Sequence, residues 1–162
     1  MKELIGAVRQ AYNNSNPYAA LALALTLPDK YPGKSSSKRY IDWFDYYVKP
    51  KHYVHSLGHK DNHEFLSGED CYALRCSLLH NGTDSIINQN KRKVLHEFRF
   101  NDVLYNYLHC CTSTEQGNRF LYLNVRTFCE DICSSVEEWL EENKQNEEIQ
   151  NRINNMFKIE IT

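Results

Sequence analysis

The chain lacks several features that mark common classes of protein. Its longest apolar run, at residues 18–27, is far too short to span a bilayer as a helix. A Gly-rich phosphate loop, an HExxH metal motif and a Gly-x-Ser-x-Gly elbow are all missing. The sequence therefore gives no indication of a cofactor, and we expect none.

Cysteine motifs are also missing. The six cysteines form no Cys-x-x-Cys pair. The N-terminal stretch MKELIGAVRQAY is amphipathic and lacks the apolar core of a signal peptide. We therefore expect reduced thiols that mostly pack as small apolar side chains, in a cytoplasmic protein that does not contact a membrane.

An excess of one charge is missing as well, since the formal net charge is −2 at pH 7. Any binding of nucleic acid would therefore need a local patch. Residues 30–60 have a charge balance of +5, whereas residues 130–148 have a balance of −7. These segments could simply be solvated faces of opposite sign. Alternatively, the basic segment faces a polyanion such as RNA, with contacts from Lys38, Arg39, Lys49 and Lys51.

Helical patterns dominate the chain, and its 162 residues without repeats or linkers predict a single domain over residues 1–162. Apolar spacing predicts helices near residues 4–12, 39–50 and 128–140, the second of them closed by Pro50. Asn16-Pro17 predicts the start of a further helix, which we expect Pro28 to end.

Strand patterns follow in the second half. The Val-, Phe- and Tyr-rich segments 94–100 and 103–111, separated by Asn101-Asp102, predict a β-hairpin. A loop at 112–118 and a third short strand at 120–123 are expected next. The predicted fold is therefore mainly α (α+β): a helical bundle with a small antiparallel β element inserted before a long C-terminal helix.

The segment LSGEDCYALRCSLLHNG, residues 66–82, carries most of the chemical information. Ser67 and Asp70 fit a variant of the capping box, and Gly82 fits a left-handed C-cap, so we expect a helix between them. Arg75 and His80 lie five positions apart near its end. Arg holds phosphate oxygens through a planar fork of donors, and His transfers protons near neutral pH. Together they can act on a phosphodiester without a metal.

Arg75 falls in the middle of the apolar stripe of this helix on a helical wheel. A charged Arg in that position needs a partner. The partner could be Asp42 or Asp45 on the aromatic helix, a ligand phosphate or a second subunit. A purely structural explanation is equally open, with Arg75 in a core ion pair and His80 as a helix cap.

The sequence ALRCSLLHNG, at the end of an apolar helix in a small and mainly helical protein, resembles the HEPN superfamily, whose signature is Arg-x4-6-His. The wider pattern RYIDWFDYYV…LSGEDCYALRCSLLHNG is similar to a group of small uncharacterised bacterial HEPN-like proteins. The motif covers six residues, and the helical arrangement around it covers about the first half of the chain. The strands and the C-terminal helix are not explained by the resemblance.

Catalytic members of that superfamily cut RNA without a metal, using the 2′-hydroxyl as nucleophile and two motif copies that meet across a dimer. The resemblance implies that Arg75 stabilises the phosphate and that His80 is the general acid and base. It also implies a homodimer, an endoribonuclease of the toxin or phage-defence type, and an antitoxin or other protein partner. Further candidate supporting residues are Glu69, Asp70, Cys76, Asp42 and Asp45.

The sequence departs from the family pattern at one position. Active members commonly have Asn, Asp or His directly after the Arg, whereas this chain has Cys76, whose thiol is a weak hydrogen-bond donor. The alternative is therefore a catalytically inactive HEPN-like module that binds RNA, nucleotide or a protein partner.

A group of histidines is the remaining candidate site. On a helix, His55, His59 and His63 would share one face and could bind zinc or nickel, with His52 nearby. Gly58 and the polar residues around it argue against a helix, and residues 51–63 are typical of a mobile connection. We therefore assign no metal to these histidines.

Overall fold

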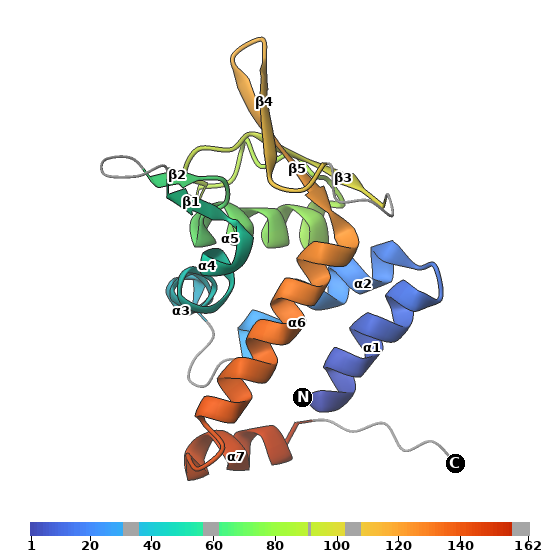
Figure 1. The fold of residues 1–162 in the computed structure, drawn as a ribbon, viewed down its shortest axis with the longest axis vertical. Helices are drawn as coiled ribbons and strands as arrows, with labels where there is room; N and C mark the ends of the chain where they lie inside the picture. Colours follow the sequence, from blue (N-terminus) through green and yellow to red (C-terminus); the bar gives the residue numbers. More distant parts are fainter. Residues whose placement is uncertain (31–35, 57–61, 91, 103–107, 157–162) are drawn as a thin grey trace.

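The computed structural model describes residues 1–30, 36–56, 62–90, 92–102 and 108–156. This part of the chain is mainly helical, and a small three-stranded sheet lies at one end of the helices (Figure 1). The prediction of a mainly helical α+β fold is therefore confirmed. Among the described helices, none combines the length and the apolar character that crossing a membrane requires.

The chain begins with two antiparallel helices, α1 (Lys2–Asn13) and α2 (Pro17–Ala24). The side chain of Asn16 accepts the amide of Ala19 at 3.1 Å, and Pro17 occupies the first turn of α2, as predicted. Helix α2 ends before Pro28, which instead lies inside a short 3-10 turn, Leu27–Lys30. This turn also carries Asp29.

The aromatic segment is helical in three consecutive parts: α3 (Ser37–Trp43), a π-helical turn (Phe44–Val48) and α4 (Lys49–His52). Pro50 lies in the first turn of α4 and does not close the helix at once, which differs from the prediction. In a regular helix a proline clashes with the carbonyl four residues before it. The wider π turn directly before α4 relieves that clash.

The segment after α4 forms a two-stranded antiparallel ladder, where the sequence predicts a mobile connection. Strands β1 (Val54–Ser56) and β2 (Asn62–Glu64) pair with Val54 opposite Glu64. The backbone at His55 and His63 is extended, so these residues do not share a helix face. His59 lies outside the described residues.

The main sheet has the strand order β3-β5-β4, formed by β3 (Glu97–Asn101), β4 (Cys111–Glu115) and β5 (Asn118–Asn124). Strand β3 pairs with β5 in parallel, and β4 pairs with β5 antiparallel. The predicted pairing was therefore wrong: the tight hairpin is β4–β5, and β4 occupies most of the expected loop at 112–118. Residues 103–107 of the other predicted strand lie outside the described residues.

The turn between β4 and β5 explains this hairpin. Gln116 and Gly117 both have positive φ, +50° and +82°. A tight two-residue hairpin turn needs two consecutive residues in the left-handed conformation, and glycine adopts that conformation at little cost. Gly117 is a turn signal in the sequence, but the segments upstream of it are more apolar and fit a strand pattern better than the polar residues of β4 do.

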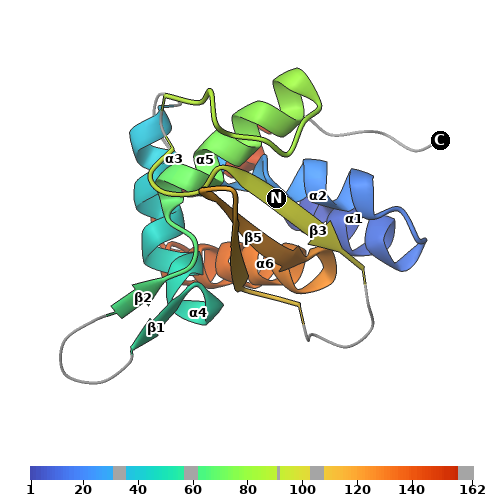
Figure 2. The ribbon, with the colours of Figure 1, turned by 90° about the horizontal axis from the view of Figure 1, so that it is seen from above.

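Helix α6 (Val125–Glu142) runs along the bundle and contacts α1, α2 and the π turn Phe44–Val48, and the short α7 (Glu147–Asn154) follows it. The predicted long C-terminal helix is thus confirmed. Figure 2 shows α6 and the motif helix α5 (Gly68–Cys76) on opposite sides of the molecule. Between them lies a core rich in large fully buried side chains, which include Tyr40, Phe44, Tyr53, Phe98 and Phe128.

Candidate functional site

The start of the motif helix α5 is held by two carboxylates, first that of Asp70 and, as described below, that of Asp45. Ser67 caps α5 by accepting the amide of Asp70 at 3.0 Å, as predicted. The buried carboxylate of Asp70 in turn accepts the Ser67 hydroxyl at 3.1 Å and the backbone amides of Lys93, Val94 and Leu95 at 2.7–3.3 Å. Asp70 therefore ties α5 to the segment that leads into β3, and its role is structural.

Gly68 brings the same helix end against α3. A Cβ atom at Gly68 would lie 2.5 Å from the carbonyl oxygen of Ile41, so only glycine fits there. The Gly68 amide donates to Asp45 at 2.8 Å. Asp45 thus satisfies a free amide at the helix start, where the helix dipole also favours a carboxylate.

The end of the motif helix is a π-helical turn, Ser77–Asn81, closed by Gly82 in the left-handed conformation with φ 65°. The predicted C-cap is therefore confirmed, whereas the π turn was not predicted. A π turn takes up an extra residue compared with an α turn. His80 is the fourth residue of this turn, so the spacing of a regular α-helix does not describe its position relative to Arg75.

Arg75 forms an ion pair with Asp29. Its Nε and Nη2 atoms both donate to Oδ2 of Asp29, at 3.0 and 2.6 Å. The predicted partners Asp42 and Asp45 were wrong, because α3 and the π turn after it place them elsewhere. Asp42 pairs with Lys38 at 2.7 Å, and Asp45 lies 3.4 Å from Lys49.

The ion pair uses only one edge of the guanidinium group. Asp29 occupies the edge formed by Nε and Nη2, while Nη1 makes a long 3.9 Å contact with the Cys76 sulfur. The ring of Tyr72 lies 5.9 Å from the guanidinium carbon. Burial by itself lowers the pKa of Arg75. The hydrogen bonds and the negative charge of Asp29 have a larger effect in the opposite direction, so the pKa of Arg75 is raised. The outer edge, Nη1 and Nη2, remains geometrically able to meet a second anion.

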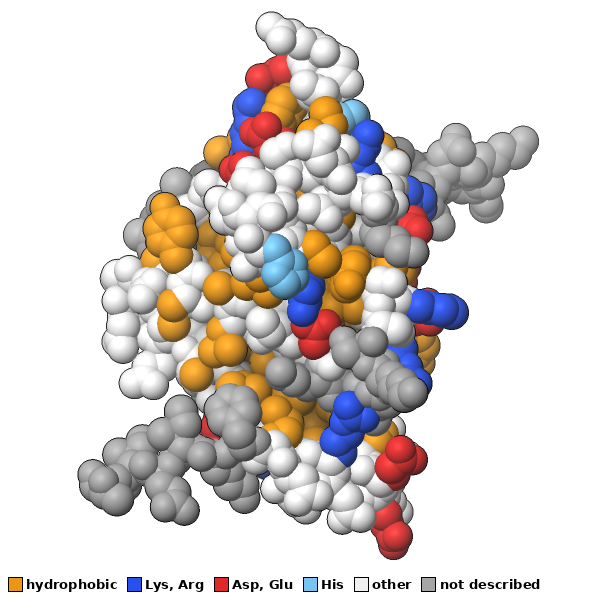
Figure 3. All heavy atoms as spheres, turned by 180° about the vertical axis from the view of Figure 1, so that it is seen from behind, with side chains coloured by type: hydrophobic (Ala, Val, Ile, Leu, Met, Phe, Trp, Pro, Cys, Tyr) orange, Lys and Arg blue, Asp and Glu red, His pale blue; other side chains and the backbone are white. Residues whose placement is uncertain are grey.

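The surroundings of Arg75 are half-buried. Its own side chain is 20% exposed, Tyr72 and Leu79 are intermediate, and His80 is exposed. Figure 3 shows the side of the molecule that faces away in Figure 1, where α5 lies, and apolar side chains are exposed across its middle between a few charged groups. The stripe around Arg75 therefore borders the solvent and is only partly covered by the core.

The predicted basic residues are largely engaged by acids. Lys38 pairs with Asp42, Lys49 reaches Glu64 at 2.5 Å, and Lys51 lies 3.4 Å from Glu138. Arg39 lies on α3 and its side chain is partly exposed. Glu69 is partly buried in the first turn of α5. The structure thus brings together Arg75 and Cys76 with Asp29, while the three lysines belong to separate ion pairs.

A second polar cluster joins His52, Tyr53, His109 and Asp131. Oδ2 of Asp131 accepts from the Tyr53 hydroxyl at 2.8 Å and from Nδ1 of His52 at 2.9 Å. Nε2 of His109 lies 4.0 Å from the same oxygen. The side chains of His109 and Asp131 are buried, whereas the His52 side chain is 53% exposed. The ligand atoms of the two histidines and Asp131 all lie within 4.8 Å of one another, a spacing that a metal ion could use.

The hydrogen bonding of His109 opposes a metal at this cluster. The backbone amide of Asn124 donates to Nδ1 of His109 at 3.2 Å. A neutral imidazole carries a single proton, so that proton resides on Nε2 and makes it a donor. A metal ion needs a lone pair at the nitrogen that it binds. The Asp131 carboxylate is thus held by hydrogen bonds from His52 and Tyr53, while Nε2 of His109 faces it at 4.0 Å without a hydrogen-bond partner among the described residues.

Sequence reasoning missed Asp29, His109 and Asp131. Asp29 and Asp131 lie in separate elements from the residues that they contact, which are 46 to 79 positions away in the chain. No local spacing signals such pairs. In comparisons with known proteins, no family model, no curated protein and no solved structure matches this chain.

Proposed function

We propose that the chain is a HEPN-like endoribonuclease that cuts RNA without a metal, with Arg75 binding the scissile phosphate and His80 transferring protons. The resemblance of the motif segment to that superfamily supports this assignment, and it also implies a homodimer. In this arrangement the motif of each subunit contributes to one composite site.

The observation that carries the proposal is the way Asp29 holds Arg75. The carboxylate accepts from the inner edge of the guanidinium, Nε and Nη2, and so fixes its plane. An arginine that is oriented in advance loses less conformational freedom when it binds a phosphate. The Arg75 side chain is 20% exposed, so part of it can meet such a ligand.

His80 complements Arg75. It is exposed, and it lies in the π turn Ser77–Asn81 that directly continues the helix of Arg75. A general acid and base must reach the proton that it transfers, which an exposed side chain next to a phosphate site can do. π turns inside helices often occur at functional sites.

The half-buried apolar stripe around Arg75 supports the dimer. Tyr72, Leu78 and Leu79 are each only partly covered by the rest of the chain. Pairing this face with that of a second copy would bury these side chains and bring two Arg75–His80 pairs together.

The test is cleavage of single-stranded RNA in EDTA by the full chain. We expect Arg75→Ala and His80→Ala each to lower cleavage by a factor of about 100 or more, within the usual range for general acid–base groups. The matched control is Arg152→Ala, because Arg152 is exposed on α7, which lies at the other end of the molecule from α5 (Figure 1). Wild-type protein that fails to cut any RNA, or variants that cut as well as wild type, would refute the nuclease function.

A second candidate, a catalytically inactive module that binds RNA or a protein partner, is favoured by Cys76. Its sulfur lies 3.9 Å from Nη1 of Arg75, where active members of the superfamily have a stronger polar side chain. Under this alternative, RNA would bind in a gel-shift assay without being cut, and Arg75→Ala would weaken that binding.

A further inference from the structure

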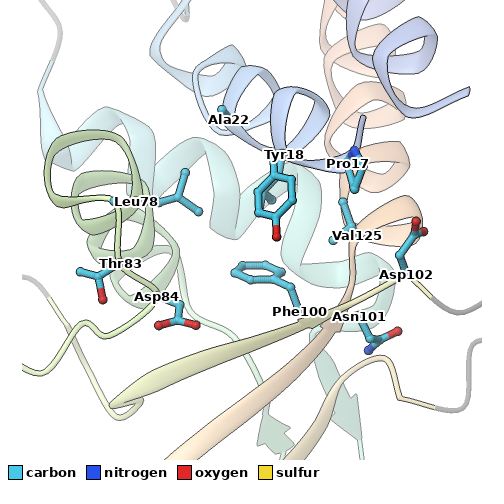
Figure 4. A pocket seen from close by; sticks show the side chains of 12 residues that line it. Pro17, Tyr18, Ala22, Leu78, Thr83, Asp84, Phe100, Asn101, Asp102 and Val125 are labelled. Atoms are coloured by element: carbon cyan, nitrogen blue, oxygen red, sulfur yellow. The ribbon is translucent and has the colours of Figure 1, made fainter. Parts of the chain in front are cut away.

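A cavity of about 570 Å³ lies beside the π turn that ends the motif helix. Its walls come from the start of α2, from the π turn and the loop after it, and from the end of β3 (Figure 4). Leu78 and Gly82 belong to this wall and flank His80 in the chain. The volume is within the range of small-molecule sites, about 300–1,000 Å³.

Two aromatic side chains point toward each other from opposite walls of the cavity, Tyr18 from α2 and Phe100 from β3 (Figure 4). Tyr18 is 87% exposed, an unusual position for a large ring. Its backbone is rigid because Pro17 and the Asn16 cap hold the first turn of α2. Phe100 is held by the sheet and stacks on Phe98 with an interplanar angle of 12°. The Phe100 ring and the backbone that carries Tyr18 are therefore positioned in advance of any ligand.

The polar part of the lining is acidic. Asp84 and Asp102 line the cavity with Asn101, and none of the described lining residues is Lys or Arg. The Tyr12 hydroxyl already donates to Asp102. In Figure 4 the Asp84 carboxylate lies at the edge of the cavity, between Thr83 and Phe100. Such a lining disfavours a phosphate group and favours an uncharged planar ring with N–H donors at its edge.

We propose that this cavity binds a guanine base of single-stranded RNA, next to the phosphate held by Arg75. Single-stranded RNA is commonly recognised by unstacked bases that stack on aromatic side chains and form hydrogen bonds through their edges. Guanine presents two adjacent N–H donors, N1–H and N2–H, which match the two oxygens of the Asp84 carboxylate. The other bases offer no such pair of parallel donors. This inference rests on the proposed function, because the guanine would belong to the RNA that the proposed nuclease cuts.

The first experiment measures the binding of guanosine, adenosine, cytidine and uridine to the full chain by saturation-transfer NMR and calorimetry. Guanosine is expected to bind most tightly. Tyr18→Ala should weaken guanosine binding by roughly tenfold, since stacking on an aromatic ring contributes about 1–3 kcal/mol per base. Asp84→Asn should remove the preference for guanosine while the other nucleosides bind as before.

The matched control is Tyr46→Ala, because Tyr46 is also an exposed tyrosine, at 69%, and does not line the cavity. Because Tyr18 is so exposed, its removal should not disturb folding, and thermal unfolding checks this. Equal binding of all four nucleosides, or guanosine binding that is unchanged by both Tyr18→Ala and Asp84→Asn, would overturn the proposal.

The second experiment maps cleavage sites on an RNA of mixed sequence, which separates this proposal from the nuclease function. Cuts next to guanines that become unselective in Asp84→Asn support both. Cuts without base preference would support the nuclease function but overturn the guanine site. Selective guanosine binding without any cleavage would support the guanine site but overturn the nuclease function.

Discussion

Arg75 donates two hydrogen bonds to a single carboxylate oxygen of Asp29, a residue 46 positions earlier in the chain. The pair joins the motif helix to the 3-10 turn after α2, and Asp29 does not occupy Nη1 of the guanidinium, which makes only the long contact with Cys76. Both side chains are mostly covered, at 20% and 15% exposure.

Removing the partner of Arg75 should destabilise the fold. In Asp29→Ala, the guanidinium loses both bonds while it stays partly covered, so we expect a loss of about 1–3 kcal/mol in the free energy of unfolding. Urea unfolding followed by circular dichroism measures it. The control is Asp42→Ala, whose ion pair with Lys38 is exposed and should contribute less than about 0.5 kcal/mol. Equal losses in the two variants would contradict the stabilising role of Asp29.

Asp70 should be among the most sensitive polar residues of the protein. It is 2% exposed and accepts from one hydroxyl and three backbone amides. Asp70→Ala leaves these donors buried without an acceptor, and we expect a loss of about 3–5 kcal/mol in unfolding free energy. Glu69→Ala, one position away and partly exposed, should change it by less than about 1 kcal/mol. A mild effect of Asp70→Ala would show that the segment 93–95 finds other acceptors.

Stability should fall when the pH drops below about 6.5, the ordinary pKa of histidine. Burial lowers the pKa of His109 in the folded state, although Asp131 partly opposes this. The unfolded chain therefore binds a proton that the folded chain excludes, and unfolding becomes more favourable as the pH falls. Urea unfolding between pH 5 and 7.5 measures the slope. His109→Gln should make the slope shallower, and an unchanged slope would assign the effect to other groups.

Zinc or nickel should not stabilise the protein through the His52–His109–Asp131 cluster. The Asn124 amide keeps the ring proton of neutral His109 on Nε2, which prevents that nitrogen from binding a metal. We expect melting temperatures within about 1 °C with EDTA, Zn²⁺ or Ni²⁺ at stoichiometric concentration, because only a tightly bound ligand shifts the transition. A saturable increase that His109→Ala abolishes would mean that the bond from Asn124 breaks on metal binding.

Two glycines should respond to alanine in opposite directions. Gly117 has φ +82° in the β4–β5 turn, so Gly117→Ala should destabilise by about 1–2 kcal/mol. Gly6 lies inside α1, where a Cβ atom would point into open space, and Gly6→Ala should stabilise by up to about 1 kcal/mol. Thermal unfolding distinguishes them. A stabilising Gly117→Ala would mean that this turn does not need a left-handed residue.

The sequence by itself determined the local features of this protein. Asn16-Pro17 begins α2, Ser67 caps α5 and Gly82 ends the π turn after it, because capping bonds link residues only a few positions apart. Apolar spacing likewise located α1 and α6. The Arg75–His80 motif was visible for the same reason, since both residues lie on one continuous helical segment.

Only the tertiary structure decided which distant segments meet. The parallel pairing of β3 with β5, the choice of Asp29 over Asp42 and Asp45, and the contact of His52 with Asp131 all join separate elements. Such pairs depend on how the helices pack around the buried aromatic core, and a local sequence pattern does not specify that packing. The cavity between Tyr18 and Phe100 arises in the same way, because α2 and β3 become neighbours only in the folded chain.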